Sequence, residues 1–240
     1  MCLNFIKEIE VNMNKVWFIT GSSGGIGLAI VKTALNNCDL VVATTRDGVL
    51  KTIKKNKNLL VLPLDVSQQN QNVFGTMRVT RSVLPIMRKQ GQGHIFNISS
   101  GAGYCGGLTA YHTSKFAVTS FSCSLAFELA SFGIKVTNVV PGMFRTSFYD
   151  SDKIKTDYDI HIEDYDTCRW QNNFMQENSK HNQVEDPNKL AELLYEVAYS
   201  DNPPLHLSVG ADAVAVLEDF GNKIKQDTTN WKDKTSKTNY

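Results

Sequence analysis

Several features that would assign this sequence to a class at once are missing from it. Lysine and arginine (25) almost balance aspartate and glutamate (24), so no basic field is present for nucleic acid or for a membrane surface. The five cysteines contain no Cys-x-x-Cys pair, and the five histidines contain no His-Glu-x-x-His motif. These absences argue against a metal site, a disulfide framework and a polyanionic partner, and they leave a small-molecule substrate.

Long apolar runs are also missing. No segment is long enough to span a bilayer, and residues 1–14 mix acidic and amide side chains among the apolar ones, unlike a signal peptide. We therefore expect a cytoplasmic protein with free thiols and a short extension at residues 1–14. A length of 240 residues suits one large domain.

What the chain does contain is a regular alternation of strand and helix patterns. Alternation of this kind predicts an α/β fold with a parallel sheet covered on both faces, which is the doubly wound arrangement of a Rossmann-type domain. The predicted strands are residues 15–20, 39–45, 58–65, 94–99 and 133–142, and the predicted helices are 25–37, 72–90 and 109–132.

The last third of the chain is less regular. Residues 146–185 are polar and aromatic without periodicity, which is typical of a binding loop. A helix over 187–199 follows, with Asp186 as its N-cap, and then a last strand near 203–210. We predict one domain over 15–221, with the loop at 146–185 as its substrate loop, followed by a frayed polar tail at 222–240.

A glycine cluster joins the first strand to the first helix. Gly21, Gly25 and Gly27 allow a tight turn through which the backbone can approach a pyrophosphate, held by the N–H groups at the start of the helix. A plain strand-to-helix turn is the alternative. The position of the cluster and the apolar strand before it favour nucleotide binding.

The end of the second strand bears on which cofactor binds. An acidic side chain there accepts the ribose hydroxyls of NAD, whereas a guanidinium suits the 2′-phosphate of NADP. Thr44 and Thr45 stand where an acid would be expected, and Arg46 follows them. The sequence favours NADP, while Asp47 keeps NAD open and a solvated surface arginine is the structural alternative.

Tyr111 and Lys115 lie four residues apart, on one face of a predicted helix. A neighbouring ammonium favours the ionised phenol, so we expect the pKa of Tyr111 to fall toward the range useful for proton exchange with an alcohol or ketone. Ser99 and Ser100 come at the carboxyl end of the preceding strand, where ligands of open α/β sheets bind.

Taken in order, these motifs resemble the classical short-chain dehydrogenase/reductase family. The motifs are T-G-x-x-x-G-I-G, S-S before Y-x-x-x-K, and P-G-x-x-x-T, all within residues 20–146. The resemblance implies a Rossmann sheet and reversible hydride transfer between NAD(P) and an alcohol or carbonyl.

The resemblance also implies roles for individual residues. Tyr111 is the expected proton donor, Lys115 tunes its pKa and binds the ribose, Ser100 polarises the substrate oxygen, and Asn72 is the fourth catalytic residue. The expected cofactor-binding residues, besides Tyr111 and Lys115, are Thr20, Gly21, Ser23, Gly25, Ile26, Gly27, Arg46, Asp65, Val66, Pro141, Gly142 and Thr146.

The family pattern breaks between Asp65 and Asn72. Family members carry a helix, a central strand, the N-N-A-G motif and half of the next helix there, and none of these is present. Two hypotheses follow: a working NADP-dependent enzyme whose fold absorbs the deletion, or an impaired nucleotide-binding derivative. The missing strand leaves an unpaired edge on each side of the gap. Because buried unpaired amides cost ~1–3 kcal/mol each, we expect the gap to close by a shift of one strand spacing, ~4.8 Å. A shortened loop before Tyr111 leaves the choice between Ser99 and Ser100 open.

Two further expectations concern partners. The helices at 72–90 and 109–132 carry apolar faces, and the family resemblance implies a homodimer or homotetramer formed through them. Aromatic residues in and beside the predicted substrate loop suggest an apolar carbonyl substrate; they are Phe144, Phe148, Tyr149, Tyr165 and Trp170.

Overall fold

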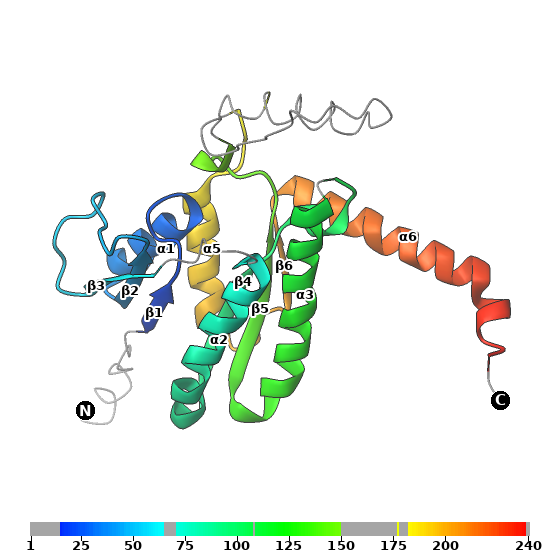
Figure 1. The fold of residues 1–240 in the computed structure, drawn as a ribbon, viewed down its shortest axis with the longest axis horizontal. Helices are drawn as coiled ribbons and strands as arrows, with labels where there is room; N and C mark the ends of the chain where they lie inside the picture. Colours follow the sequence, from blue (N-terminus) through cyan, green and yellow to red (C-terminus); the bar gives the residue numbers. More distant parts are fainter. Residues whose placement is uncertain (1–14, 65–70, 108, 150–176, 178–181, 239–240) are drawn as a thin grey trace, which may run out of the picture. The chain divides into compact units, whose positions relative to one another are not determined.

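The computed structural model describes residues 15–64, 71–107, 109–149, 177 and 182–238. These residues form two compact units. The first consists of the chain up to Val66 together with Pro187–Glu196, and the second of Ser67–Asp186 with Val197–Tyr240. Figure 1 shows the elements of each unit, which are described in turn below.

The first unit is a three-stranded parallel sheet with its helices. Its strands lie in the order β1-β2-β3, with Val16 opposite Leu40 and Val41 opposite Leu59. The elements are β1 (Val16–Ile19), α1 (Gly25–Asn36), β2 (Leu40–Thr45), β3 (Leu59–Pro63) and the first ten residues of α5 (Pro187–Tyr199).

Packing of α1 on β2 forms the core of this unit. Strand β2 occupies the centre of the sheet, which suits its β-branched, largely buried sequence LVVATT. Val31 and Ala34 of α1 pack with Val41 and Ala43 of β2, and all four are at most 2% exposed. The core thereby fixes the end of β2 and the start of α1, which carry the predicted cofactor residues.

The second unit contains the other half of the Rossmann-type arrangement. Its strands are also parallel, in the order β4-β5-β6. The elements are α2 (Gln71–Gln90), β4 (Gly93–Ile98), α3 (Thr109–Leu129), β5 (Ile134–Pro141), β6 (His206–Val209), α6 (Ala211–Thr235) and short 3-10 turns at Gly101–Tyr104, Ala130–Phe132 and Ser147–Tyr149.

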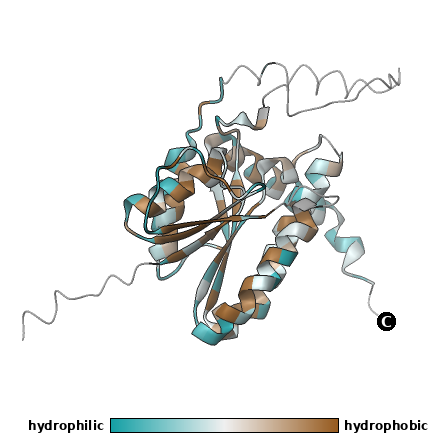
Figure 2. Cartoon of the chain, turned by 60° about the vertical axis from the view of Figure 1, so that its left-hand side comes forward, coloured by the Kyte–Doolittle hydropathy of each residue, from teal (hydrophilic) through white to brown (hydrophobic). Residues whose placement is uncertain are grey.

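The core of the second unit lies between α3 and the sheet. Leu125 and Leu129 of α3 pack on Ile95 of β4 and on Ile134 and Val136 of β5. Partly buried side chains of α2 cover the same cluster. The strands are accordingly among the most apolar elements of the chain (Figure 2). This packing places the beginning of α3 beside the carboxyl end of β4.

The two separate sheets bear directly on the predicted break. In the described part of the chain β1 pairs with β2 alone and β4 pairs with β5 alone, so each is an edge strand. The closure expected at the gap is not found among the strand pairs of the described residues, where β1 and β4 belong to separate sheets. The helix and strand limits predicted around the gap are confirmed, with α2 beginning at Gln71 and β4 at Gly93.

One prediction is wrong. Residues after Asn222 were expected to form a frayed tail, but α6 continues to Thr235 although every residue from Gly221 to Lys237 is exposed. An ion pair between Lys223 and Asp219, 2.7 Å apart, joins successive turns, and Lys232 and Lys234 lie in the last turn, where cations favour the helix dipole. The polar composition of this segment suits an exposed helix. No helix in the described ranges combines the length and apolarity that a bilayer span requires.

Candidate active site

The glycine turn of the first unit has the geometry of an anion-binding loop. Gly21 adopts a φ of 66° and Gly25 a φ of 54°, which are left-handed conformations that favour glycine. Buried Ser22 braces the turn: its N–H donates to the carbonyl of Thr44 at 3.0 Å, and its hydroxyl donates to the carbonyl of Ile19 at 2.9 Å. The turn is thus held against the ends of β1 and β2.

Helix α1 begins immediately after this turn without a side-chain cap. Gly24 is its N-cap, and the first turn of the helix contains no acidic residue. Its first N–H groups therefore retain the positive end of the helix dipole for an anionic ligand. A Cβ at Gly27 would collide with the carbonyl of Gly21, so the third glycine is needed for close packing of helix on turn.

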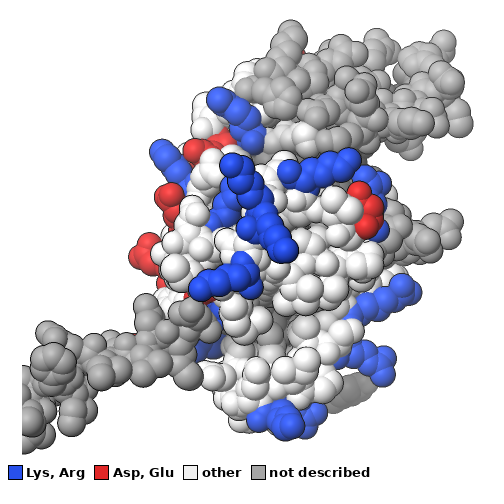
Figure 3. Space-filling view, turned by 90° about the vertical axis from the view of Figure 1, so that its left-hand side faces the viewer, with Lys and Arg blue, Asp and Glu red and all other residues white. Residues whose placement is uncertain are grey.

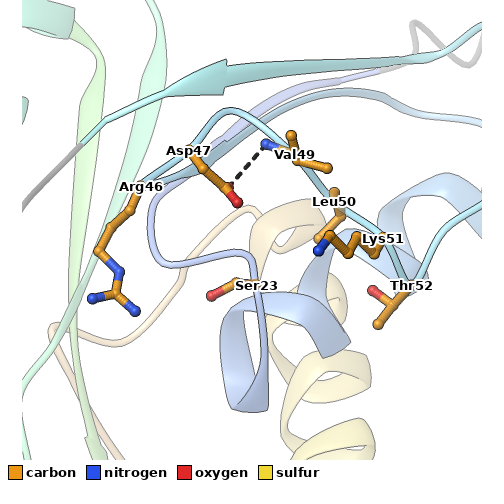
Figure 4. Close-up of a pocket in the computed structure, with 7 residues that line it drawn as sticks. All are labelled: Ser23, Arg46, Asp47, Val49, Leu50, Lys51 and Thr52. Carbon is orange, nitrogen blue, oxygen red and sulfur yellow. Dashed lines mark hydrogen bonds between the residues drawn. The ribbon is translucent and has the colours of Figure 1, made fainter.

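A pocket of about 520 Å³ adjoins this turn, and Ser23, Arg46 and Lys51 are among its lining residues. Figure 4 shows the Arg46 and Lys51 side chains on two sides of the pocket, with the Ser23 hydroxyl between them. Residues 46–57 carry five basic side chains and one acidic one. Figure 3 faces this part of the chain and shows that Lys and Arg outnumber Asp and Glu on its surface. The pocket suits a phosphate group.

Asp47, the acidic residue that makes NAD a possible cofactor, hydrogen-bonds residues of its own turn. Its Oδ1 accepts hydrogen bonds from the Val49 N–H at 3.1 Å and the Thr45 hydroxyl at 3.0 Å. These two bonds, the Val49 bond first, lower the pKa of the carboxyl group. Both donors bind the same oxygen, so Oδ2 keeps its capacity to accept and Asp47 still leaves NAD open beside Arg46.

The two candidate serines of the second unit have different partners. Ser99 is buried, and its hydroxyl donates to the Val139 carbonyl of β5 at 3.0 Å. Ser100 accepts a hydrogen bond from the Ala102 N–H at 3.1 Å, and its hydroxyl is near enough to Tyr111 to act against the rise in the pKa of that phenol. The geometry therefore favours Ser100 over Ser99 as the serine beside the reacting phenol.

Lys115 lies one helical turn after Tyr111 on α3, as the spacing predicted. Its Nζ is 5.8 Å from the centre of the Tyr111 ring and donates to the Ile98 carbonyl at 3.2 Å. The expected pKa direction of Tyr111 is wrong: burial raises it, and the Ser100 hydrogen bond opposes this only in part. Burial also lowers the pKa of Lys115.

The segment after β5 runs close to the start of α6. Pro141 is the buried last residue of β5, and the Gly142 N–H donates to the Val209 carbonyl at 2.9 Å. A Cβ at Gly142 would collide with the Asp212 carboxylate, so a larger residue there would have to displace that side chain. Thr146 accepts a hydrogen bond from the Phe148 N–H at 3.3 Å. The segment is braced where the cofactor amide is expected.

Three predicted site residues have little or no structural description. Asp65 and Val66 lie outside the described residues, as does most of the expected substrate loop at 146–185. Asn72 lies in the first turn of α2. Within the described ranges, no group of three or more His, Cys, Asp or Glu residues could hold a metal ion.

Comparison with known proteins decides the family. A sequence model described as short chain dehydrogenase matches residues 70–156. Oxidoreductase BOA17 of Botryotinia fuckeliana is 33% identical over 276 residues, with 92% of this chain and 98% of the relative covered. The chain belongs to the short-chain dehydrogenase family.

Solved short-chain dehydrogenase structures share the fold. A short-chain dehydrogenase from Streptomyces avermitilis superposes with a TM-score of 0.78 at 26% identity, covering 95% of this chain and 100% of the other. The closed form of a serine dehydrogenase complexed with NADP⁺ superposes with a TM-score of 0.67 at 22% identity, covering 81% and 94%. The Rossmann-type prediction is thereby confirmed.

Lys51 and Asp212 are two residues that the motifs did not reveal. Lys51 lies five residues beyond Arg46 in a segment without regular structure, and only the shape of the pocket associates it with the arginine. Asp212 lies at the start of α6, and its Oδ2 accepts the Met143 N–H at 2.7 Å. A sequence separation of 69 residues hides this contact from pattern reading.

Replacing Asp212 tests whether it positions the cofactor segment of this short-chain dehydrogenase. We expect Asp212→Ala to weaken NADPH binding about tenfold, because the Met143 N–H loses a charged acceptor and the Gly142 turn loosens. Asp212→Asn should retain most of the affinity, since its amide oxygen still accepts. Titration by nucleotide fluorescence measures the effect, and Asp219→Ala on the same helix is the control. Equal affinity of Asp212→Ala and wild type would contradict the assignment.

Proposed function

We propose that the protein is an NADPH-dependent oxidoreductase that interconverts an alcohol and a carbonyl compound. The arrangement that best supports this is Lys115 one turn after Tyr111 on the same helix, with its Nζ 5.8 Å from the centre of the phenol ring and with the Ser100 hydroxyl acting on the same phenol. A neutral phenol beside a second hydroxyl can protonate a developing alkoxide as the carbonyl is reduced.

Each predicted catalytic residue of the second unit has a distinct role in the proposed reaction. NADPH supplies the hydride. Tyr111 donates its phenolic proton to the substrate oxygen, and the Ser100 hydroxyl hydrogen-bonds that oxygen while its charge develops. Lys115 places a cation near the phenol, which stabilises the phenolate left after proton transfer. Asn72 completes the predicted catalytic set from the first turn of α2.

The preference for NADP is supported by the pocket of the first unit. The pocket is lined by the cations Arg46 and Lys51, which suit a 2′-phosphate, and by one carboxylate, Asp47. The similar serine dehydrogenase structure contains NADP⁺. A similar Burkholderia phymatum enzyme, with a TM-score of 0.70 and 17% identity, contains NAD, which remains the alternative cofactor.

The shortened centre supports a second candidate function. The alignment with the Botryotinia relative spans 276 positions against the 240 residues of this chain, so at least 36 positions have no counterpart here. The family model begins to match only at residue 70. We place the missing positions between Asp65 and Asn72. A nucleotide-binding protein without turnover is therefore the alternative.

The other parts of the proposal concern partners, substrate and domain limits. A second copy of the chain is proposed to pack on α2 and α3, because Phe74, Ile86 and Phe127 are 55%, 60% and 86% exposed there. An apolar substrate is supported by Phe148, whose ring centre is 6.0 Å from that of Tyr111. A cytoplasmic location and a domain over 15–221 complete the proposal.

Nucleotide titration followed by a carbonyl screen tests the function. Purified protein is titrated with NADPH and NADH by fluorescence while a melting scan is recorded, and NADPH oxidation is then followed with a panel of aldehydes and ketones. We expect NADPH to bind more tightly, to raise the melting temperature and to be oxidised. Binding without oxidation of NADPH would support the nucleotide-binding alternative, and absence of binding would overturn both.

A further inference from the structure

A cysteine and a histidine meet in the second unit, apart from the proposed reacting residues. Cys123 lies on α3 and His206 is the first residue of β6, with Sγ and Nε2 3.6 Å apart. Cys123 is a free, partly exposed thiol, and His206 is exposed. Reagents from solvent can therefore reach the pair in the single chain, and the second copy proposed to pack on α2 and α3 must leave it open for the reaction proposed below.

Asn138 holds the far side of the imidazole. It is the strand partner of His206 across β5 and β6, and its Nδ2 is 3.5 Å from His206 Nδ1. Asn138 is fully buried, its Nδ2 also donates to the Thr119 hydroxyl at 3.3 Å, and its Oδ1 has no partner within the described residues. A buried amide with an unused acceptor is uncommon in a site that serves packing alone.

The Asn138 amide and the Cys123 sulfur face opposite nitrogens of the His206 ring. Either tautomer of the ring can serve the sulfur: Nε2 accepts the thiol proton, or Nε2–H donates to the sulfur. Both exchanges assist attack by a sulfur that has given up its proton, which is the nucleophilic form of cysteine.

We propose that Cys123 is a modification site that reacts with α,β-unsaturated carbonyl compounds. The Cys123 proton leaves to solvent, and the sulfur lone pair forms a bond to the β-carbon. The carbon–carbon π pair then shifts to give the enolate, which takes a proton from water, so atoms and electrons balance without an oxidant. His206 acts on the sulfur and Asn138 acts through His206, which makes Asn138 a positioning residue.

Cys105 provides an internal comparison. It is exposed and belongs to the same unit, so the reagent reaches both thiols. Its Sγ donates to the Ala102 carbonyl at 3.8 Å, and burial raises its pKa, so its surroundings favour the protonated thiol. The two cysteines differ in the group that faces the sulfur.

Alkylation of the full chain by acrylamide at neutral pH tests the proposal, with the rate at each cysteine read by peptide mass spectrometry. We expect Cys123 to react about tenfold faster than Cys105, the ratio that a hydrogen bond to a charged group supports. His206→Leu should remove this advantage and leave the rate at Cys105 unchanged. His112→Leu is the control, because His112 Nδ1 contacts the Cys105 carbonyl oxygen, not a sulfur.

Two results would overturn the proposal. One is a wild-type protein in which Cys123 reacts no faster than Cys105. This comparison uses no variant, so it does not depend on whether a variant folds. The other is a folded His206→Leu protein, verified by its melting transition, in which Cys123 keeps its rate. Neither result bears on NADPH oxidation, because neither cysteine belongs to the proposed reacting set.

Discussion

Tyr111→Phe is expected to lower the turnover of carbonyl reduction by about 10²- to 10⁴-fold, the usual contribution of a positioned general acid. The substitution removes the proton that protonates the alkoxide, and it keeps the ring that contacts Phe148. NADPH affinity should change little. Stopped-flow or steady-state oxidation of NADPH measures the turnover, and fluorescence titration measures the affinity.

Tyr104→Phe is the matched control for this variant. Tyr104 lies in the same unit and packs edge-to-face against Phe116, and its hydroxyl contacts Thr119 at 3.3 Å. Its loss should leave turnover within a few-fold of wild type. Comparable losses in the two variants would show that the phenol at 111 has no special part in the reaction.

The raised pKa of Tyr111 sets the expected pH profile. A phenol donates its proton only below its pKa, and burial moves that pKa above 10.0. Carbonyl reduction should therefore keep a constant rate from neutral pH upward and fall only in the alkaline range, whereas alcohol oxidation, which needs the phenolate, should rise there. A reduction rate that falls already near neutral pH would contradict this protonation state.

The second large effect is expected at the cofactor pocket. Replacing Arg46 and Lys51 together by alanine should weaken NADPH binding by about 10- to 100-fold, since each cation forms a charge-assisted contact with the 2′-phosphate. NADH affinity should stay within a few-fold, because NADH lacks that phosphate. The preference for NADPH should therefore disappear. Parallel fluorescence titrations with both nucleotides give the ratio directly.

Lys54→Ala combined with Lys57→Ala is the control for net charge. Both lysines lie in the same basic segment but not among the residues lining the pocket. If their removal weakens NADPH as much as the Arg46 and Lys51 replacements, general attraction and not a phosphate site explains the preference. Raising the salt concentration should shrink the effect of the control replacements on NADPH affinity more than the effect of the Arg46 and Lys51 replacements. Salt screens long-range attraction more strongly than direct contacts.

How much of the site the sequence predicted depends on how local each part is. The glycine turn and the Tyr111–Lys115 pair follow from spacings of a few residues, and the structure keeps both. Asp212 contacts Met143, which lies 69 residues earlier in the chain, so no local pattern reveals it. The choice of Ser100 over Ser99 required the structure, which shows that the Ser99 hydroxyl bonds the Val139 carbonyl whereas the Ser100 hydroxyl accepts from the Ala102 N–H.

Burial explains the other failure of the sequence reading. The charge of Lys115 was visible in the sequence, and its effect alone lowers a phenol's pKa, but the enclosure of Tyr111 was not visible and outweighs it. For the fold, alternation of strand and helix patterns was enough to predict every strand of both sheets. It could not predict that α6 continues beyond Asn222, because a fully exposed helix has no apolar face to produce periodicity.

The first unit is built from two segments that lie far apart in the sequence, and this affects how it folds during synthesis on the ribosome. Its strands and α1 are complete once residue 63 has left the exit tunnel, yet Pro187–Glu196 also belong to it. Tyr195 stacks on Trp17 with ring centres 6.0 Å apart, and this contact waits for more than a hundred further residues. At about 5–20 residues per second, the nascent sheet spends several seconds without that helix. The interval is the period in which a chaperone would have the most exposed apolar surface to bind.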